Sequence, residues 1–339
     1  MKMRKFLLTA AVLPLLAACS GGDGFTSSRP LMDTFVTVTA YGDRAAARAA
    51  ADAAFDEMDR VVKVFNAHDP DSELGRLNAS AGAAPFGVSP ELFGLIELSL
   101  RYSELTGGAF DITVGPVLDL WREARRTGRI PGTKALAAAR ARTGWRGVIL
   151  DPGERTIKFA VPGMKLDLGG AAKGFVVDKG VEELRRRGVK AALIDAGGDL
   201  RAYGRPPGRK FWKIGIKHPR EKGALLGLLK LAEPAVATSG DYERYFEKDG
   251  KKYHHIIDPV SGGPAPRSVG VTAVAPTCAE ADIIATALFV MGPEKGLALL
   301  ETAGGLDAAV VTAEAGRIGV EFSAGLRESA ELYEGVGEG

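Results

Sequence analysis

The spacing of hydrophobic and polar residues predicts a strand followed by helices in the first half of the chain. Residues 31–41 alternate between the two classes, as a half-buried β-strand requires. Residues 43–66 then carry apolar side chains at helical spacing. Ser89 as N-cap and Pro90 in the first turn predict another helix, which extends to Leu105 and stops at a glycine pair. Shorter helices are predicted over residues 114–124 and 133–142.

From about residue 145 the pattern changes to short β-like runs that glycine and proline separate. These runs cover residues 147–150, 156–160, 190–195, 199–204, 211–218, 223–232 and 269–275. Helical patterns interrupt them over residues 171–187, 278–291 and 293–303, and a terminal β pair is predicted over residues 307–321. Strands and helices in this arrangement predict an α+β fold, in which a helical region packs on a mixed sheet.

The N-terminus has a different pattern. Lys2, Arg4 and Lys5 precede an apolar run that begins at Phe6 and leads into the segment Leu-Ala-Ala-Cys, which ends at Cys19. This arrangement indicates a secretory signal, because the apolar run is too short to span a bilayer as a permanent helix. The four-residue segment resembles a bacterial lipobox, with Cys19 as the lipidated residue. An ordinary signal peptide cut nearby is the alternative.

These patterns divide the chain into four segments. We expect residues 1–18 to be a lipoprotein signal peptide and residues 19–30 to be a flexible tether, because glycine, serine and aspartate are typical of linkers. Residues 31–322 then form one domain, and residues 323–339 form a C-terminal tail. Processing would leave Cys278 as the free thiol, so no intramolecular disulfide is expected.

The overall composition limits the classes of function. With 339 residues, of which 46% are hydrophobic, the chain can bury one large core or two modest ones. The 44 lysines and arginines nearly balance the 42 aspartates and glutamates, which leaves a formal net charge of +2. This balance gives no electrostatic reason to expect nucleic acid as a partner. The function has to be sought in particular sites.

The segment DLGGAAKGFVVD, residues 167–178, is a candidate phosphate site. Two glycines lead from a strand end into a helix whose first turn carries Lys173. Glycines let a phosphate approach the backbone, and the free N–H groups of a helix N-terminus attract it. The alternative is a glycine-rich turn with a solvated lysine, because the spacing matches neither a dinucleotide fingerprint nor a Walker A loop.

The segment YHHIIDPVSGGPAP, residues 253–266, contains two of the four histidines of the chain. If residues 253–257 form a strand, His254 and His255 point in opposite directions, so at most one of them enters a given site. His255 is the candidate general base, with Asp258 close to it. The alternative is a hairpin that carries both histidines on its surface.

A helical stretch at residues 278–292 carries Asp282 and Thr286 four positions apart, which places them on one face. A carboxylate and a hydroxyl are hard oxygen ligands that suit Mg²⁺ better than zinc. The surrounding residues are apolar, so the polar pair would be costly there without a partner. The alternative is that Asp282 interacts with the helix dipole while Thr286 bonds to a backbone carbonyl.

The order of the motifs carries more information than any one of them. TGGAFDIT at residues 106–113 and ATSGDYERYFE at residues 237–247 would each be a loop if taken alone. The other motifs are Met32-Asp33-Thr34, DPDSELGRLN at 69–78, DLGGAAKGFVVD, DAGGDL at 195–200, HHIIDP and ADIIATALFVMG. Together they resemble the FAD:protein FMN transferase family, the ApbE-type flavin transferases formerly described as thiamine-biosynthesis lipoproteins. The resemblance extends from about residue 31 to residue 322.

The resemblance implies a mixed sheet flanked by helices, with FAD in a cleft between the helical and sheet parts. It places Lys173 by the pyrophosphate and His255 near the reacting phosphate. It also implies that Mg²⁺ is bound by the side chains of Asp282 and Thr286 and by the carbonyl of Gly170. Contacts with FAD are implied for Met32, His68, Ala109, Phe110, Asp111, Asp178 and Ile257. His68 stands where many members of the family have a tyrosine.

The implied activity is the Mg²⁺-dependent transfer of the FMN moiety of FAD to a threonine hydroxyl of an acceptor protein, with release of AMP. An FAD-binding lipoprotein without transferase activity and a Mg²⁺-dependent FAD pyrophosphatase are the alternatives, because the nucleophile belongs to another molecule. The expected partners are an acceptor redox protein with an exposed threonine and, through Cys19, a lipid bilayer. Ser20 after this cysteine favours the outer over the inner membrane, facing the periplasm.

Overall fold

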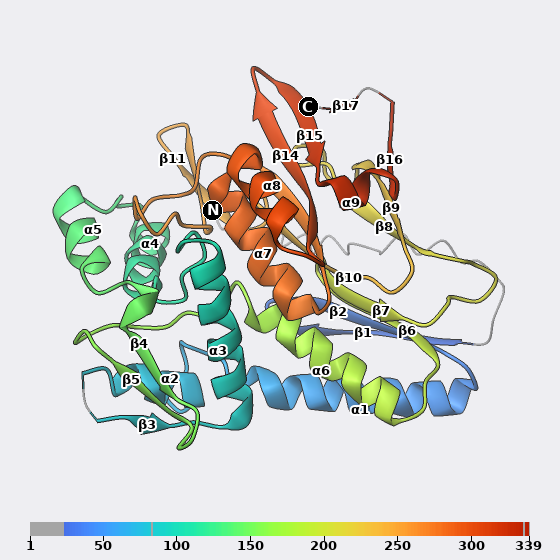
Figure 1. Cartoon of the computed structure of the whole chain (residues 1–339), viewed down its shortest axis with the longest axis horizontal. Helices are drawn as coiled ribbons and strands as arrows, with labels where there is room; N and C mark the ends of the chain where they lie inside the picture. Colours follow the sequence, from blue (N-terminus) through green and yellow to red (C-terminus); the bar gives the residue numbers. More distant parts are fainter. Residues whose placement is uncertain (1–23, 83, 335, 339) are drawn as a thin grey trace, which may run out of the picture.

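A nine-stranded sheet organises the computed structural model, which describes residues 24–82, 84–334 and 336–338 (Figure 1). Its strands lie in the order β1-β2-β6-β7-β10-β13-β14-β15-β17, and only the last pair is parallel. The strands are β1 (Gly24–Leu31), β2 (Thr34–Tyr41), β6 (Ala191–Ala196), β7 (Asp199–Tyr203), β10 (Ala235–Gly240), β13 (Gly270–Ala275), β14 (Asp307–Glu314), β15 (Arg317–Phe322) and β17 (Gly337–Glu338). The sheet is therefore mixed, though almost entirely antiparallel.

Three helices cover one face of this sheet: α1 (Arg44–Val62), α6 (Ala172–Arg186) and α7 (Cys278–Met291) (Figure 1). Alternate residues of β2, including Val36 and Val38, point into the core beneath them and are fully buried. α7 is apolar on nearly every side, and such a helix is stable only when other elements surround it. It packs against β10, β13 and α6, which places its polar residues inside the protein.

A second apolar cluster lies on the opposite face of the sheet. Val236 and Leu200 of the large sheet contribute to it, together with Trp212 and Ile214 of a three-stranded sheet. That smaller sheet has the order β16-β9-β8 and consists of β8 (Trp212–Lys217), β9 (Leu225–Leu231) and β16 (Ala330–Leu332). Strands β7, β10 and β14 thus contribute to an apolar cluster on each face of the large sheet.

The remaining elements form a largely helical region beside the sheet (Figure 1). This region contains α2 (Glu73–Ala79), α3 (Pro90–Leu105), α4 (Gly115–Thr127), α5 (Thr133–Arg140), a short 3-10 helix (Trp145–Gly147), β3 (Phe86–Gly87), β4 (Val148–Asp151), β5 (Thr156–Phe159), β11 (Tyr245–Lys248) and β12 (Lys251–His254). Two further helices pack on the sheet itself: α8 (Pro293–Thr302) contacts α7 and β14, and α9 (Ala324–Arg327) contacts β14 and β15. The predicted α+β class is confirmed. Within the described residues no helix is both long and apolar enough to cross a membrane.

The structure corrects the expected segment boundaries at both ends. β1 pairs with β2 along its whole length, so residues 24–30 belong to the sheet and not to a flexible tether. The predicted strand over residues 31–41 is interrupted by a tight turn, in which Met32 and Asp33 have φ values of 54° and 59°. The expected tail also folds, because it supplies α9 and β16. The expected signal peptide and Cys19 lie outside the described residues.

Candidate active site

The predicted phosphate-binding lysine lies in the first turn of α6 and makes a buried ion pair. Lys173 Nζ is 2.7 Å from Oδ1 of Asp199, a residue of β7 with no exposed surface. The Asp199 carboxylate accepts no hydrogen bond from the other described residues. Burial opposes the charge on Lys173, but the carboxylates of Asp199 and Asp282 outweigh it and raise the pKa of the lysine. The ammonium therefore stays charged and directed at this carboxylate pair.

Asp282 lies next to that ion pair and is only 5% exposed. The N–H of Gly174, near the start of α6, donates to its Oδ2 at 3.3 Å. Burial raises the pKa of Asp282 well above its usual range, the neighbouring Asp199 raises it further, and Lys173 opposes both. Two buried carboxylates share one lysine here, and an additional cation would relieve the excess of negative charge.

Thr286 follows Asp282 on the same face of α7, one turn further along. Its Oγ1 is 3.3 Å from the hydroxyl of Ser239 at the end of β10. A Cβ on Gly170 would lie 3.0 Å from this Thr286 oxygen and 3.2 Å from Cε2 of Phe110. Gly170, Thr286 and Phe110 therefore meet at one point, just before α6 begins.

These donors fit the magnesium ion that the sequence analysis expected. Asp282 and Thr286 offer a carboxylate and a hydroxyl on one helix face, and the backbone of Gly170 lies beside the hydroxyl. Hard oxygen donors of this kind are typical of Mg²⁺ sites.

The described residues contain no cluster of three or more histidine, cysteine, aspartate or glutamate side chains placed to hold a metal. Cys278 is buried, and burial raises the pKa of its thiol well above normal.

The two neighbouring histidines have different hydrogen bonds. His254 ends β12, and both of its ring nitrogens are occupied: Nδ1 accepts from the N–H of Ile256 at 3.3 Å, and Nε2 lies 3.0 Å from the carbonyl of Ala265. Its ring also packs edge-on against Phe289 of α7. His254 is therefore held by the backbone on both sides of its ring.

His255 is bonded through one ring nitrogen only. Its Nδ1 is 3.1 Å from the carbonyl oxygen of Arg244, which can only accept, so the proton lies on Nδ1 and Nε2 keeps its lone pair. The residue keeps exposed surface, but its pKa is lowered to about 4, mainly by desolvation of the ring and also by the charges of Arg244 and Lys173, while the bond to the Arg244 carbonyl opposes the shift. This ring is a neutral proton acceptor at neutral pH.

Arg244 connects His255 to the end of the β1–β2 hairpin. Its guanidinium lies 3.6 Å from the carboxylate of Asp33, in the same turn as Met32. The neighbouring Glu243 pairs with Lys217 at 3.0 Å, and Lys217 lies close to the Gly197-Gly198 turn that precedes Asp199. The turn that contains Met32 therefore lies at the same end of the sheet as His255 and Asp199.

Several residues that the sequence analysis assigned to FAD also make contacts within the protein. The Asp111 carboxylate accepts from the backbone and hydroxyl of Thr113 and from the N–H of Trp145, so its acceptor positions are already used inside the protein. Burial raises the pKa of Asp111, and these hydrogen bonds oppose the rise. Ile257 is packed in the apolar cluster under α4. Both side chains are held within the protein, and their expected contact with FAD stays a prediction.

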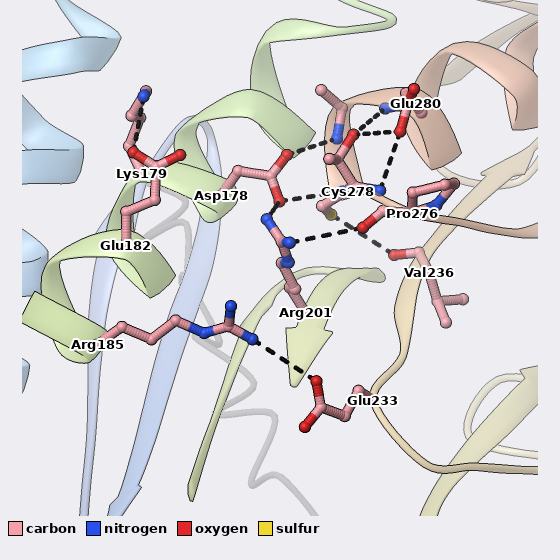
Figure 2. Close-up of polar contacts among 12 residues, drawn as sticks. Asp178, Lys179, Glu182, Arg185, Arg201, Glu233, Val236, Pro276, Cys278 and Glu280 are labelled. Atoms are coloured by element: carbon pink, nitrogen blue, oxygen red, sulfur yellow. Dashed lines mark hydrogen bonds and ion pairs between the residues drawn. The ribbon is translucent and has the colours of Figure 1, made fainter. Parts of the chain in front are cut away.

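Asp178 and Asp258 likewise make hydrogen bonds within the protein. Figure 2 shows Asp178 between α6 and α7, where it accepts from the N–H groups of Cys278 and Ala279 and pairs with Arg201. The Asp258 carboxylate accepts from the N–H of Val260 within its own turn. No bond among the described residues joins Asp258 to His255, whose orientation the Arg244 carbonyl sets instead.

The other expected contacts lie at the edges of the site. Ala109 is half-buried beside Phe110 and packs on the main core. Met32 is also half-buried and packs on this core from the hairpin turn. His68 is exposed, and its N–H donates to the side chain of Asn66 in a loop after α1. Its ring makes no hydrogen bond to the site residues described above.

Three residues of the site were not singled out from the sequence. Asp199 lies in the DAGGDL motif and is fully buried against Lys173, while Ser239 and Arg244 lie in the motif ATSGDYERYFE. The motifs themselves were recognised, but the spacing along the chain gives no indication of which member faces the helix pair. A buried aspartate directly after a glycine turn was the available signal for Asp199.

Comparisons with known proteins agree with this geometry. A protein of Treponema pallidum named FAD:protein FMN transferase is 38% identical over 301 residues, which are 84% of this chain and 83% of that protein. A protein of Klebsiella pneumoniae with the same name is 36% identical over 260 residues, 76% of this chain and 80% of that protein.

Solved structures give the same result. Flavin transferase ApbE from Vibrio cholerae superposes with a TM-score of 0.82 at 28% identity, covering 91% of this chain and 99% of that one. The ApbE protein of Thermotoga maritima superposes with a TM-score of 0.80 at 30% identity, covering 92% and 97%. The sequence model of the ApbE family matches residues 32–310. With its motifs, its fold and most of its length in agreement, the chain belongs to the ApbE family.

Proposed function

We propose that this protein transfers the FMN moiety of FAD to a threonine hydroxyl of an acceptor protein in a Mg²⁺-dependent reaction that releases AMP. The observation that carries the proposal is the buried group formed by Lys173, Asp199 and Asp282, with Gly170 and Thr286 beside it. This group lies where α6 begins, and His255 lies near enough for the charge of Lys173 to influence its pKa. Relatives that carry the name FAD:protein FMN transferase support the choice of reaction.

The start of α6 provides the binding site for the pyrophosphate of FAD. Helix N-termini present N–H groups without intrahelical partners, and Gly169 and Gly170 leave the backbone accessible just before the helix. Lys173 adds a permanent positive charge beside these N–H groups. Positioning and charge neutralisation account for most of the catalysis of phosphoryl transfer, and this arrangement supplies part of both.

Asp282, Thr286 and Gly170 would hold the Mg²⁺ ion, which when bound neutralises charge on the pyrophosphate. His255 accepts the proton of the attacking hydroxyl at Nε2, because its Nδ1 is engaged by the Arg244 carbonyl. A bond forms between the threonine oxygen and the FMN-side phosphorus, and the bond from that phosphorus to the bridging oxygen breaks. AMP leaves with that oxygen, so atoms and charge balance.

The test is a reaction of the purified protein with FAD, Mg²⁺ and a candidate acceptor, followed by mass spectrometry of the acceptor and quantification of AMP. We expect FMN on a threonine through a phosphoester, with one AMP for each label, and no label when EDTA is present. Full-rate formation of AMP and free FMN without an acceptor would support the pyrophosphatase instead. Bound FAD that never turns over would support a flavin-holding lipoprotein.

We also propose that the protein is exported and held at the outer membrane, facing the periplasm, through acylation of Cys19. The support is the sequence alone: a positive segment, a short apolar run and the segment that ends in this cysteine, with Ser20 after it. An exported redox protein is then the natural acceptor. Labelled palmitate should enter the wild type but not Cys19→Ser, and equal labelling of both would contradict the proposal.

A further inference from the structure

α6 and α7 each have a carboxylate that accepts hydrogen bonds from N–H groups at the N-terminus of the other helix. The N–H of Gly174, in the first turn of α6, donates to Asp282 of α7. In the opposite direction, the N–H groups of Cys278 and Ala279, the first two residues of α7, donate to Asp178 of α6 at 3.0 Å each. Each helix thus provides an anion for the N–H groups of the other that lack intrahelical partners.

The Asp178 carboxylate contacts both α7 and an arginine of the sheet. It is 5% exposed, and its Oδ1 is 2.6 Å from Nη1 of Arg201 on β7, as Figure 2 shows. Nη2 of the same arginine lies 3.5 Å from the carbonyl of Pro276, just before α7. The carboxylate therefore connects three elements: α6, α7 and the central strand between them.

The two helices are in backbone contact at this point. A Cβ on Gly174 would lie 2.2 Å from the carbonyl oxygen of Cys278, so α7 approaches α6 as closely as a glycine permits. Asp282 follows Cys278 by one helical turn, and Thr286 follows by two. Because a helix moves as a rigid rod over this length, the position of its first turn sets the position of both side chains.

We propose that Asp178 is a positioning residue, which fixes the Asp282–Thr286 pair of α7 relative to Lys173 of α6. The inference rests on the proposed function, because it assigns Mg²⁺ to that pair. In this role Asp178 acts through α7 and not through contact with the metal or FAD. It holds the first turn of α7 against α6, and the spacing between the lysine and the metal pair follows from that contact.

Asp178→Asn tests the proposal. Cys278 and Ala279 donate to different oxygens of Asp178. An asparagine keeps an acceptor at one of these positions and places its NH₂ group, a donor, at the other, so one of the two bonds is replaced by a donor–donor contact. We expect Mg²⁺ affinity, measured by calorimetry with Mg²⁺ alone, to fall about tenfold, as is common when a group supporting metal ligands is lost. The half-saturating Mg²⁺ concentration for turnover should rise by the same factor, with kcat largely recovered at saturation.

Thr277→Val is the matched control. Thr277 caps the same end of α7 by accepting from the N–H of Glu280, and its side-chain bonds stay within α7 and its cap. Its loss should lower the thermal midpoint but leave Mg²⁺ affinity unchanged, because the link to α6 is intact. If both variants weaken Mg²⁺ equally, or if Asp178→Asn binds it as the wild type does, the positioning role is wrong.

A second variant covers the case in which Asp178→Asn does not fold. Arg201→Gln removes the counter-charge but keeps the carboxylate and its two backbone bonds, and we expect it to weaken Mg²⁺ binding about threefold. Unchanged Mg²⁺ affinity in this variant would then overturn the proposal. A wild-type protein that binds no Mg²⁺ would instead contradict the metal site of the proposed function, and the positioning role with it.

Discussion

Replacing Gly174 by alanine should separate the two helices that form the site. The new Cβ would lie 2.2 Å from the carbonyl oxygen of Cys278 and 2.7 Å from the backbone nitrogen of Ala279. Ordinary van der Waals contact begins at 3.4 Å, so α7 must move away from α6 because no flexible side chain can yield. The movement would also stretch the bond from the Gly174 N–H to Asp282.

The expected net cost is about 1.5 to 5 kcal/mol of unfolding free energy. Overpacking costs about 1 to 3 kcal/mol, and a hydrogen bond to a buried charged group contributes about 1.5 to 3 kcal/mol. The better helix propensity of alanine returns about 1 kcal/mol. Mg²⁺ affinity should fall as well, because Asp282 moves away from Gly170 together with its helix.

Urea unfolding measures the first effect, and calorimetric titration with Mg²⁺ measures the second. The control is Gly94→Ala in the middle of α3, where a Cβ would meet nothing within 4 Å. That variant should be about 0.5 to 1 kcal/mol more stable than the wild type. If Gly174→Ala proved as stable as Gly94→Ala and bound Mg²⁺ normally, the contact between α6 and α7 would not be as close as described.

Three other outcomes are expected. Asp282→Ala should abolish Mg²⁺-dependent turnover, whereas Thr286→Ala should only weaken metal affinity; full activity of the first at low Mg²⁺ would remove this site from consideration. His255→Ala should lower turnover roughly a hundred- to ten-thousand-fold with FAD still bound, and His254→Ala much less; the reverse order would show that the roles are exchanged. Because the folded pKa of His255 is about 4, its ring should stay neutral as pH falls through 6.5 and gain its proton only near pH 4. NMR titration of the ligand-free protein measures this directly, and a midpoint near 6.5 would contradict it.

The local sequence was sufficient where the structure depends on local interactions. The α3 helix runs from Pro90 to Leu105 as predicted, because its cap and its stop signal lie within the segment. The strand β1 was missed, because glycine, serine and aspartate near residue 24 resemble a linker. Its stability comes from pairing with β2 and from the sheet behind it, which composition does not indicate.

The same distinction applies to the site. The spacing of Asp282 and Thr286 on one helix face could be calculated from the sequence, and the structure keeps them there. The role of Asp178 could not be obtained in this way, because the donors that occupy it are 100 residues further along the chain. Strand alternation likewise allowed one histidine into the site without deciding which. Backbone carbonyls eleven residues from each ring distinguish them.

The β1–β2 hairpin separates the start of the described chain from the end of the sheet where Arg244 and His255 lie. The described chain begins at Gly24, which pairs with Tyr41, and the turn at Met32 and Asp33 lies at the other end of the ladder. Eight paired residues span about 26 Å at the usual rise of a strand. If the proposed tether precedes Gly24, Arg244 and His255 would lie at the opposite end of this ladder from the point where the tether joins the domain.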